Sequence, residues 1–423
     1  MINVLSSAAF FRRFTKNNVF ASVLLAMSSL SFAEAAPSDY ASTINDLAEA
    51  GQALALTRFD LNDVSFLYPL PESARDFDYL LGATSPALGG LLVPESVRTP
   101  PTSIFGKAMS AEHRIIAARV DHCFPGTEEK PCVRQIRLTA DAVVENPETG
   151  IVSTTDQPIH LFYELTNSAF KELVSELRAL KALANGETDG KALSVNPVMK
   201  KEGLDGPYAR KLNDIIARFA GEENLVRIAD MNLGGKFTGS SSRVFFQRDL
   251  NENFLPIPGT LTGGGEEAVT QAVFSQVGNR FGFLTVGPRN SKFELLWRHQ
   301  TNDLGPFLNE PTQTEIEEAV NDMFRIDNPK LSDVTNTDCV SCHIAERVRK
   351  AVVENPESAL SEMAFTNEFK NRRYDLTPTH NGLDIIFEKM FGYSDTAPSV
   401  SVRVANETSI VARALSQARF QVK

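Results

Sequence analysis

Residues 115–142 read IIAARVDHCFPGTEEKPCVRQIRLTADA, and this stretch gives the clearest indication of the fold of the chain. Two runs rich in strand-forming residues, Ile115–His122 and Val133–Ala142, flank a polar segment that contains Pro and Gly. Such an arrangement is typical of two strands joined by a loop. The stretch therefore predicts a strand pair in the N-terminal part of the chain.

Further alternation of apolar and polar residues extends this pattern along the chain. PIHLFYEL (158–165) predicts a strand, and residues 169–183 and 208–219 have helical spacing, as do residues 41–58. Several strand-like runs follow within 225–300, separated by Gly, Pro and Asn. Residues 36–304 are therefore predicted to form a mixed α/β body. The order of elements over 133–183 is similar to that over 270–324, which suggests two similar modules of unknown role.

The N-terminus has the pattern of a secretory signal peptide. A basic segment precedes the apolar stretch Val19–Ala33, which is too short for a comfortable membrane span, and Ala33-Glu34-Ala35 offers a cleavage site. The basic residues are Arg12, Arg13 and Lys16. We therefore predict that residues 1–35 are a signal peptide, with an uncleaved anchor as the alternative. The product is expected to be periplasmic or otherwise exported, with no integral membrane span after cleavage.

Export affects the expected state of the cysteines. The chain has four cysteines, and an oxidising compartment favours their pairing. Cys123 and Cys132 bracket the loop between the two predicted strands, so we predict a disulfide that closes this loop. Cys339 and Cys342 then remain for another role.

Composition sets wider limits. Of the 423 residues, 22% are charged and 42% are hydrophobic, which is an ordinary globular balance. The formal net charge of −11 disfavours nucleic acid and anionic lipid as partners.

The character of the sequence changes at about residue 305. Helices are predicted over 314–324, from Asp338 to about Glu354, over 383–391 and over 404–418. We therefore expect an α+β protein, in which the mixed α/β body of residues 36–304 precedes a mainly α-helical domain over 305–423.

Residues 337–347, TDCVSCHIAER, contain Cys339-Val340-Ser341-Cys342-His343. Two thiols at this spacing can bond the two vinyl groups of a haem, and the histidine that follows can then ligate the iron. A zinc site would need two further ligands at finger-like spacing, and a thioredoxin-like dithiol would need a strand and then a helix around the motif. Neither pattern is present, although both alternatives stay open.

In this motif and its helix the chain resembles the c-type cytochromes. The resemblance implies one covalently attached haem c, held by Cys339 and Cys342, with His343 as the proximal ligand. The single motif implies a single haem. Met390, in EKMFGYS, is similar to the methionine ligand of the short bacterial class I cytochromes, which implies that it is the second axial ligand.

Other assignments of the second ligand remain open. His380 and Met363 are the other candidates after the motif, and the iron can also be five-coordinate. Met390 itself is equally suited to pack in the core, on the helix predicted over 383–391.

Basic residues after the motif bear on partners. They can steer an acidic redox partner or pair with the haem propionates, and they also fit an ordinary solvated helix face. These residues are Arg347, Arg349, Lys350, Lys370, Arg372 and Arg373.

Three functions fit these observations. The first is an exported monohaem cytochrome that transfers electrons to or from a redox partner protein. The second is a haem enzyme that acts on a small oxidant, as a peroxidase does. The third is a haem-based binding or sensor module. The first is the leading hypothesis, so the protein is expected to be an electron carrier rather than an enzyme.

Overall fold

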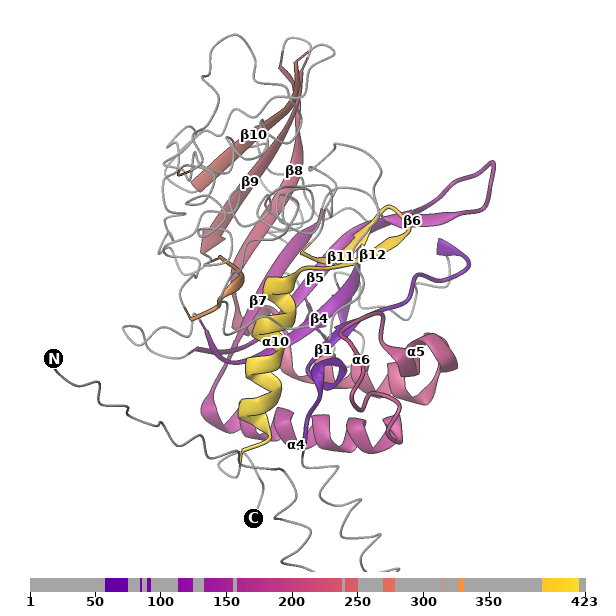
Figure 1. Cartoon of the computed structure of the whole chain (residues 1–423), viewed down its shortest axis with the longest axis vertical. Helices are drawn as coiled ribbons and strands as arrows, with labels where there is room; N and C mark the ends of the chain where they lie inside the picture. Colours follow the sequence, from indigo (N-terminus) through magenta and orange to yellow (C-terminus); the bar gives the residue numbers. More distant parts are fainter. Residues whose placement is uncertain are drawn as a thin grey trace, which may run out of the picture. The chain divides into compact units, whose positions relative to one another are not determined.

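The computed structural model describes residues 58–74, 84–85, 90–92, 113–124, 133–154, 158–237, 240–249, 269–277, 314, 326–330 and 390–417. Within them the main element is an antiparallel sheet of eight strands in the order β1-β4-β5-β7-β8-β9-β10, with β6 paired to β5 (Figure 1). Its strands are β1 (Ser65–Leu67), β4 (His113–Phe124), β5 (Val133–Glu145), β6 (Val152–Thr154), β7 (Ile159–Leu165), β8 (Leu225–Phe237), β9 (Ser240–Asp249) and β10 (Val269–Val277). A separate pair is formed by β2 (Thr84–Ser85) and β3 (Gly90–Leu91).

One face of this sheet is apolar. Ala118 on β4 stands opposite Leu138 on β5, Leu138 opposite Leu161 on β7, and Leu161 opposite Ile228 on β8. Directly opposed residues of an antiparallel sheet share a face, so these four side chains form one row across four strands. All four are buried. This row forms the sheet side of the hydrophobic core.

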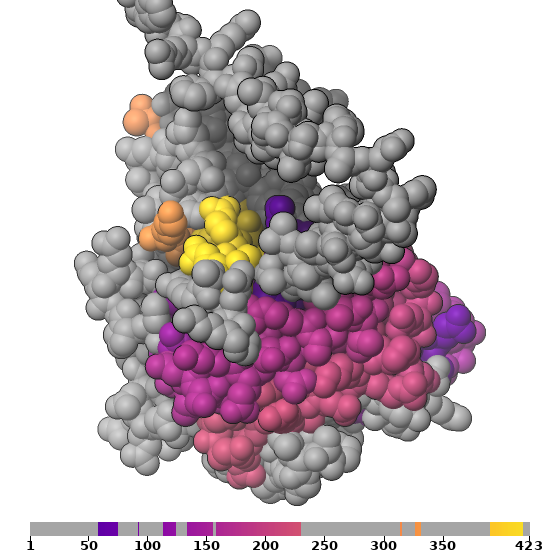
Figure 2. All heavy atoms as spheres, turned by 90° about the horizontal axis from the view of Figure 1, so that it is seen from below, coloured from indigo at the N-terminus to yellow at the C-terminus, as the bar shows by residue number. Residues whose placement is uncertain are grey.

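Among the elements that the structure describes, α4 (Asn167–Ala184), α5 (Pro197–Glu202) and α6 (Pro207–Phe219) lie on the apolar face. Helix α4 packs on β5 and β7 and against α6, which in turn contacts the short helix α5. Figure 2, seen from below, shows much of this layer as a surface of magenta and pink atoms. The single-turn elements η1 (Leu61–Asp63) and η3 (Glu222–Asn224) complete this half of the molecule.

The sequence of α4 explains both its ends and its packing. The Thr166 side chain accepts a hydrogen bond from the Ala169 backbone N–H at 3.2 Å, which caps the first turn. Asn185 ends the helix in the left-handed conformation, with φ of 47°. Between these ends, buried apolar residues recur at helical spacing. They are Phe170, Leu173, Val174, Leu177 and Leu180.

The opposite face of the sheet is polar, and it carries the residues that alternate with the apolar row. Arg119 on β4 stands opposite Arg137 on β5, Arg137 opposite Phe162 on β7, and Phe162 opposite Arg227 on β8. Asp121 and Gln135 form part of the next row on the same face. We refer to this side as the polar face.

Helix α10 (Val402–Leu415) packs on the polar face. Its Thr408 hydroxyl lies 2.9 Å from that of Ser65 on β1, and its Glu407 carboxylate lies 2.9 Å from the Arg119 guanidinium on β4. The Ser401 side chain caps the helix by accepting a hydrogen bond from the Val404 N–H. The sheet is therefore enclosed between helices from two distant parts of the chain.

A hairpin leads into α10. Strands β11 (Phe391–Ser394) and β12 (Ala397–Val400) pair around a two-residue turn in which Asp395 has φ of 60°, as such turns require. The Tyr393 hydroxyl donates to the Tyr68 carbonyl at 2.6 Å, and the Thr154 N–H donates to the Asp395 carbonyl at 3.0 Å. The hairpin is thus fixed to the chain around β1 and β6.

The expectation of a mainly α-helical C-terminal domain of the cytochrome c kind is wrong. The described part of 305–423 contains a strand pair and one long helix, and both belong to the same hydrophobic core as the sheet. The predicted helix over 404–418 is present as α10, but the apolar residues at 391–400 belong to short strands. The fold is therefore a sheet-rich α+β fold, and the predicted boundary between residues 304 and 305 lies outside the described residues.

Several element predictions are confirmed. The predicted strand pair is β4 and β5, the strand over 158–165 is β7, and the helices over 169–183 and 208–219 are α4 and α6. The strands expected in 225–300 include β8, β9 and β10. The predicted helices over 41–58 and 338–354, and most of those over 314–324 and 383–391, lie outside the described residues. So do residues 1–35 and most of the proposed second module over 270–324.

Among the described residues, no helix has both the length and the apolar character that a membrane crossing needs.

The packing of α4 leads to a stability prediction. Leu177 is 1% exposed, whereas Leu183 on the same helix is 47% exposed. A Leu→Ala change alters helix propensity by nearly the same amount at both positions, so a difference between the two variants measures the effect of burial. We expect Leu177→Ala to lower the free energy of unfolding by about 2–5 kcal/mol, and Leu183→Ala to change it by less than about 0.5 kcal/mol. Urea unfolding followed by circular dichroism measures both. Equal effects of the two substitutions would contradict the assignment of Leu177 to the buried side of α4 and of Leu183 to its exposed side.

Candidate functional site

The predicted haem-binding residues lie outside the part of the chain that the structure describes. They are Cys339, Cys342 and His343, together with His380 and Met363. Haem attachment therefore stays a prediction from the sequence. What the structure does describe is the chain on either side of this segment, at residues 326–330 and from residue 390 onward.

The predicted disulfide also stays a prediction. Cys123 is near the end of β4, and Phe124 beside it stands opposite Val133 at the start of β5. The loop between the strands is therefore where the sequence predicted it, whereas Cys132 lies outside the described residues.

Met390, the candidate second ligand, is described. It directly precedes β11, it is partly buried, and its side chain packs against the hydrophobic core. Its carbonyl accepts a hydrogen bond from the Ser401 N–H at 2.9 Å. These contacts correspond to the packing role that the sequence left open for Met390, and its ligation of iron stays a prediction.

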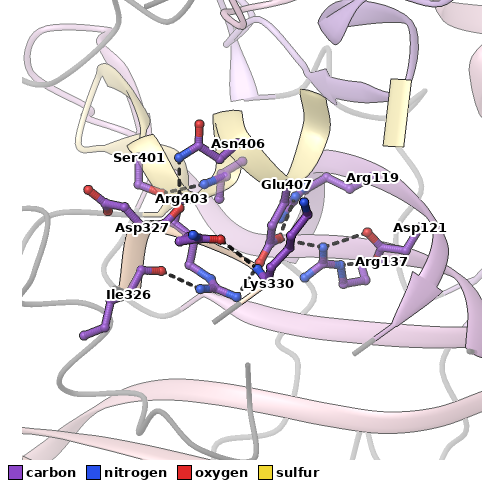
Figure 3. A network of polar contacts seen from close by, with 12 residues as sticks. Arg119, Asp121, Arg137, Ile326, Asp327, Lys330, Ser401, Arg403, Asn406 and Glu407 are labelled. Carbon is purple, nitrogen blue, oxygen red and sulfur yellow. Dashed lines mark hydrogen bonds and ion pairs between the residues drawn. The ribbon is translucent and has the colours of Figure 1, made fainter. Parts of the chain in front are cut away.

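The chain before the motif is attached to the same part of α10. The Ile326 carbonyl accepts a hydrogen bond from Arg403 Nη1 at 2.5 Å, and the Asp327 carbonyl accepts one from Asn406 Nδ2 at 2.8 Å (Figure 3). Ser401, Arg403 and Asn406 all lie at the beginning of α10. Both flanks of the segment 331–389 are thus bound at one end of one helix.

Glu407, one turn after Arg403, is the centre of a buried ionic network (Figure 3). Its Oε2 lies 2.9 Å from Arg119 Nη2 and 3.0 Å from Arg137 Nη2, and its Oε1 lies 2.9 Å from Arg403 Nη2. The Glu407 side chain is 15% exposed. One carboxylate therefore joins three guanidinium groups from β4, β5 and α10.

A second carboxylate supports the network from within the sheet. Asp121 on β4 forms an ion pair with Arg137, and its Oδ1 accepts a hydrogen bond from Arg137 Nη2 at 2.8 Å. Its Oδ2 accepts one from Gln135 Nε2 at 2.9 Å. These contacts orient the Arg137 guanidinium toward Glu407, because a planar guanidinium has donors in fixed directions.

The electrostatics of Glu407 result from two opposing effects. Burial alone would raise the pKa of the Glu407 carboxyl, but the charges of Arg403, Arg137 and Arg119 outweigh it and hold the pKa far below its ordinary value. Burial and the neighbouring Arg137 charge lower the pKa of Arg119. The carboxylate is therefore ionised throughout the physiological range, and the network is a fixed one.

This arrangement is suited to holding segments in place rather than to proton transfer. The Glu407 carboxylate is shared among three guanidinium groups, none of which changes charge near neutral pH. Within the described part of the chain, no group of three or more His, Cys, Asp or Glu side chains is placed to hold a metal ion. We therefore regard the Glu407 network as structural: it joins α10 to β4 and β5.

A second ionic cluster joins the buried side chains of Lys181 and Asp63 to the more exposed Asp189. Lys181 Nζ on α4 lies 2.6 Å from Asp63 Oδ2 and 2.6 Å from Asp189 Oδ1, and Thr188 Oγ1 donates to Asp63 Oδ1 at 2.6 Å. Burial alone would lower the pKa of Lys181, but Asp63 and Asp189 raise it. The cluster connects η1, α4 and the loop after α4, so its role is structural.

The sequence did not single out the residues of the Glu407 network. A usable signal was present, because Arg119 and Asp121, like Gln135 and Arg137, are alternate positions of predicted strands. Alternate polar positions on a strand usually face solvent. The burial of these four residues could therefore be predicted only if the position of α10 were known. The separation of Arg119 and Glu407 by 288 positions is beyond any local pattern.

Comparison with known protein families, curated proteins and solved structures finds no match to this chain. The functional assignment therefore depends on the residues themselves.

The Glu407 network leads to a second stability prediction. Glu407→Gln keeps the shape of the side chain but leaves the Arg119, Arg137 and Arg403 charges buried without their common counter-ion. We expect a loss of about 3–5 kcal/mol in the free energy of unfolding, measured in urea. Glu172→Gln, which removes an exposed ion pair with Arg218, is the matched control and should cost less than about 1 kcal/mol. Similar costs for the two variants would show that the network is not a buried one.

The lowered pKa of Glu407 also predicts how the stability lost in Glu407→Gln depends on pH. A carboxyl group whose pKa is lower in the folded state contributes stability above its unfolded pKa, near 4.5, and this contribution is lost as pH falls toward the folded pKa. The stability difference between the wild-type chain and Glu407→Gln should therefore be largest above pH 4.5 and should shrink below it. Urea midpoints between pH 7 and pH 3 measure this difference. A difference that grows on acidification would contradict the direction of the pKa shift.

Proposed function

We propose that the protein is an exported monohaem c-type cytochrome that carries electrons. The observation that supports this most is Cys339-Val340-Ser341-Cys342-His343, in a chain whose N-terminus has the pattern of a secretory signal. The two features are independent, and covalent haem attachment takes place outside the cytoplasm.

The residues of the motif Cys339–His343 fit a covalently attached haem. Each thiol adds across one vinyl group of the haem: a sulfur–carbon bond forms, the thiol hydrogen ends on the other vinyl carbon, and nothing is released. Cys339 and Cys342 would provide the two thiols, and His343, next to the second of them, would ligate the iron through its imidazole. The group supplies a one-electron couple, while the chain supplies attachment, axial ligation and the surface that a partner recognises.

The expected partner is another redox protein. The basic residues after the motif favour a partner whose contact surface is acidic, because attraction between opposite charges speeds the encounter. The net charge of −11 argues against nucleic acid and anionic lipid as alternatives.

A second candidate function is a haem enzyme with an open coordination position. The observation that favours it is the packing of the Met390 side chain against the core, which competes with iron ligation. An iron without a second protein ligand can bind a small oxidant.

Haem attachment is tested by removing thiols in pairs. In cells that export and assemble c-type cytochromes, the double variant Cys339→Ser/Cys342→Ser should lose all haem staining after denaturing electrophoresis, because no thioether can form. The matched double variant Cys123→Ser/Cys132→Ser should keep it. Haem that remains with the first variant at the wild-type level would exclude a c-type attachment at this motif.

The two candidate functions differ in the state of the iron. If Met390 is the second ligand, the oxidised protein shows the near-infrared methionine–iron band, and Met390→Leu removes it. If the position is open, the wild-type protein lacks this band and its reduced form binds CO at once. Visible and near-infrared spectra of wild type and Met390→Leu separate the cases. A band that Met390→Leu leaves unchanged would assign the ligand to another methionine, with Met363 as the candidate.

A further inference from the structure

The loop after α4 begins with a tight turn. The Glu187 N–H donates a hydrogen bond to the Ala184 carbonyl at 2.9 Å, and the two residues between them, Asn185 and Gly186, have φ of 47° and 80°. Asn followed by Gly is a favoured pair where two consecutive residues need positive φ, because Gly has no Cβ atom and Asn tolerates the left-handed region. The turn thus places an asparagine directly before a glycine, and both residues are exposed.

An asparagine that precedes a glycine can lose its side-chain amide without an enzyme. The Gly186 backbone nitrogen attacks Asn185 Cγ: a nitrogen–carbon bond forms, the bond from Cγ to the amide nitrogen breaks, and ammonia leaves with the hydrogen of the Gly186 N–H. Water then opens the cyclic succinimide at either carbonyl, which gives aspartate or isoaspartate. Glycine favours the attack because it has no side chain to hinder the approach of its nitrogen. Water is the co-reactant that the reaction needs.

The structure leaves this pair accessible to the reaction. Among the described residues, neither the Asn185 side chain nor the Gly186 N–H forms a hydrogen bond. Space is open as well: beyond the adjoining residues, the nearest described atom to the position that a Cβ atom of Gly186 would take is Asp189 Oδ2, at 3.7 Å. Ring closure requires rotation about the Asn185 backbone, which breaks the hydrogen bond from Glu187 to Ala184. Water can replace that bond at an exposed turn.

A second pair of the same kind, Asp189 and Gly190, follows in the same loop and provides an internal comparison. Aspartate before glycine forms the same succinimide, with loss of water. Here the attacking Gly190 N–H donates to Asp60 Oδ2 at 2.8 Å, and Asp189 Oδ1 lies 2.6 Å from Lys181 Nζ. Both contacts must break before the ring can close. The fold therefore restrains the second pair, whereas it leaves the first pair open.

We propose that Asn185 is a site of spontaneous deamidation in the folded protein, through ring closure with Gly186, and that Asp189 in the same loop is protected. The inference uses only the contacts of this loop, so it does not depend on the proposed haem function.

Deamidation changes both the charge and the backbone of the loop. Either product adds a carboxylate at the C-terminal end of α4, where the helix dipole disfavours negative charge. Isoaspartate also adds a carbon atom to the backbone of the turn. The residues that follow hold the loop on the body, because Thr188 donates to Asp63 at 2.6 Å and Asp189 pairs with Lys181. The isoaspartate form should therefore be less stable than the unmodified chain.

Ageing of the purified wild-type chain tests the site. One sample is folded and one is unfolded in urea; both are incubated at mildly alkaline pH and then digested with trypsin at mildly acidic pH, which limits further conversion. Cleavage after Lys181 and Lys191 releases both pairs in one peptide, residues 182–191. Mass spectrometry separates the amide from the acid, and electron-transfer fragmentation distinguishes isoaspartate from aspartate at each position.

We expect Asn185 to be converted in the folded chain at a rate of the same order as in the unfolded chain, and faster as pH rises, because the attacking nitrogen must lose its proton. Isoaspartate at Asp189 should form at least about tenfold more slowly in the folded chain than in urea, since its contacts must open first. Protection of Asn185 by about tenfold or more in the folded chain, or reaction of Asp189 as fast as in urea, would overturn the proposal.

The aged material also tests the effect on stability. Ion exchange separates the deamidated chain, which has an additional negative charge, from the unmodified chain. The isoaspartate fraction should have a lower urea midpoint than the unmodified fraction. Equal midpoints would show that the contacts of Thr188 and Asp189 survive the modification, and would contradict the predicted loss of stability.

Discussion

The structure depends on the burial of one carboxylate. Glu407 is placed on the polar face of the sheet among Arg119, Arg137 and Arg403, and burial makes each of these contacts stronger than it would be in water. Removal of the Glu407 carboxylate leaves the buried Arg119, Arg137 and Arg403 guanidinium groups without their common counter-ion. The network therefore specifies where α10 lies on the sheet, although buried ion pairs add little net stability compared with apolar packing.

The position of α10 in turn determines where residues 326–327 and the hairpin β11–β12 are attached to the sheet. The hairpin β11–β12 leads directly into this helix, and the hydroxyl of Tyr393 ties the hairpin to the carbonyl of Tyr68. Residues 326–327 bind to the same helix through Arg403 and Asn406. The motif Cys339–His343 thus belongs to a segment that begins and ends on the sheet body.

The elements of the body could be predicted from sequence because each has a strong local signal. The strands around 115–142 alternate, and α4 has both an apolar stripe and a capping threonine. The C-terminal region was predicted wrongly as mainly helical, because short strands such as β11 and β12 contain too few residues for a distinct period. The turn at Asp395 was the available signal, and it is weak without knowledge of the partner strand.

The residues of the candidate site also differ in how well they could be predicted from the sequence. Cys339, Cys342 and His343 are recognisable because the chemistry of attachment requires that order of residues. The Glu407 network was not recognisable, because its members are ordinary charged residues until the fold buries them together. Met390 is an intermediate case: its sequence context favours iron ligation, whereas its surroundings in the structure favour packing.

The most direct test of the central claim is the intact mass of the denatured protein purified from the exported fraction of cells that assemble c-type cytochromes. The account predicts the mass of residues 36–423 plus one haem, with no loss of haem on denaturation. A mass that corresponds to the polypeptide alone would contradict it.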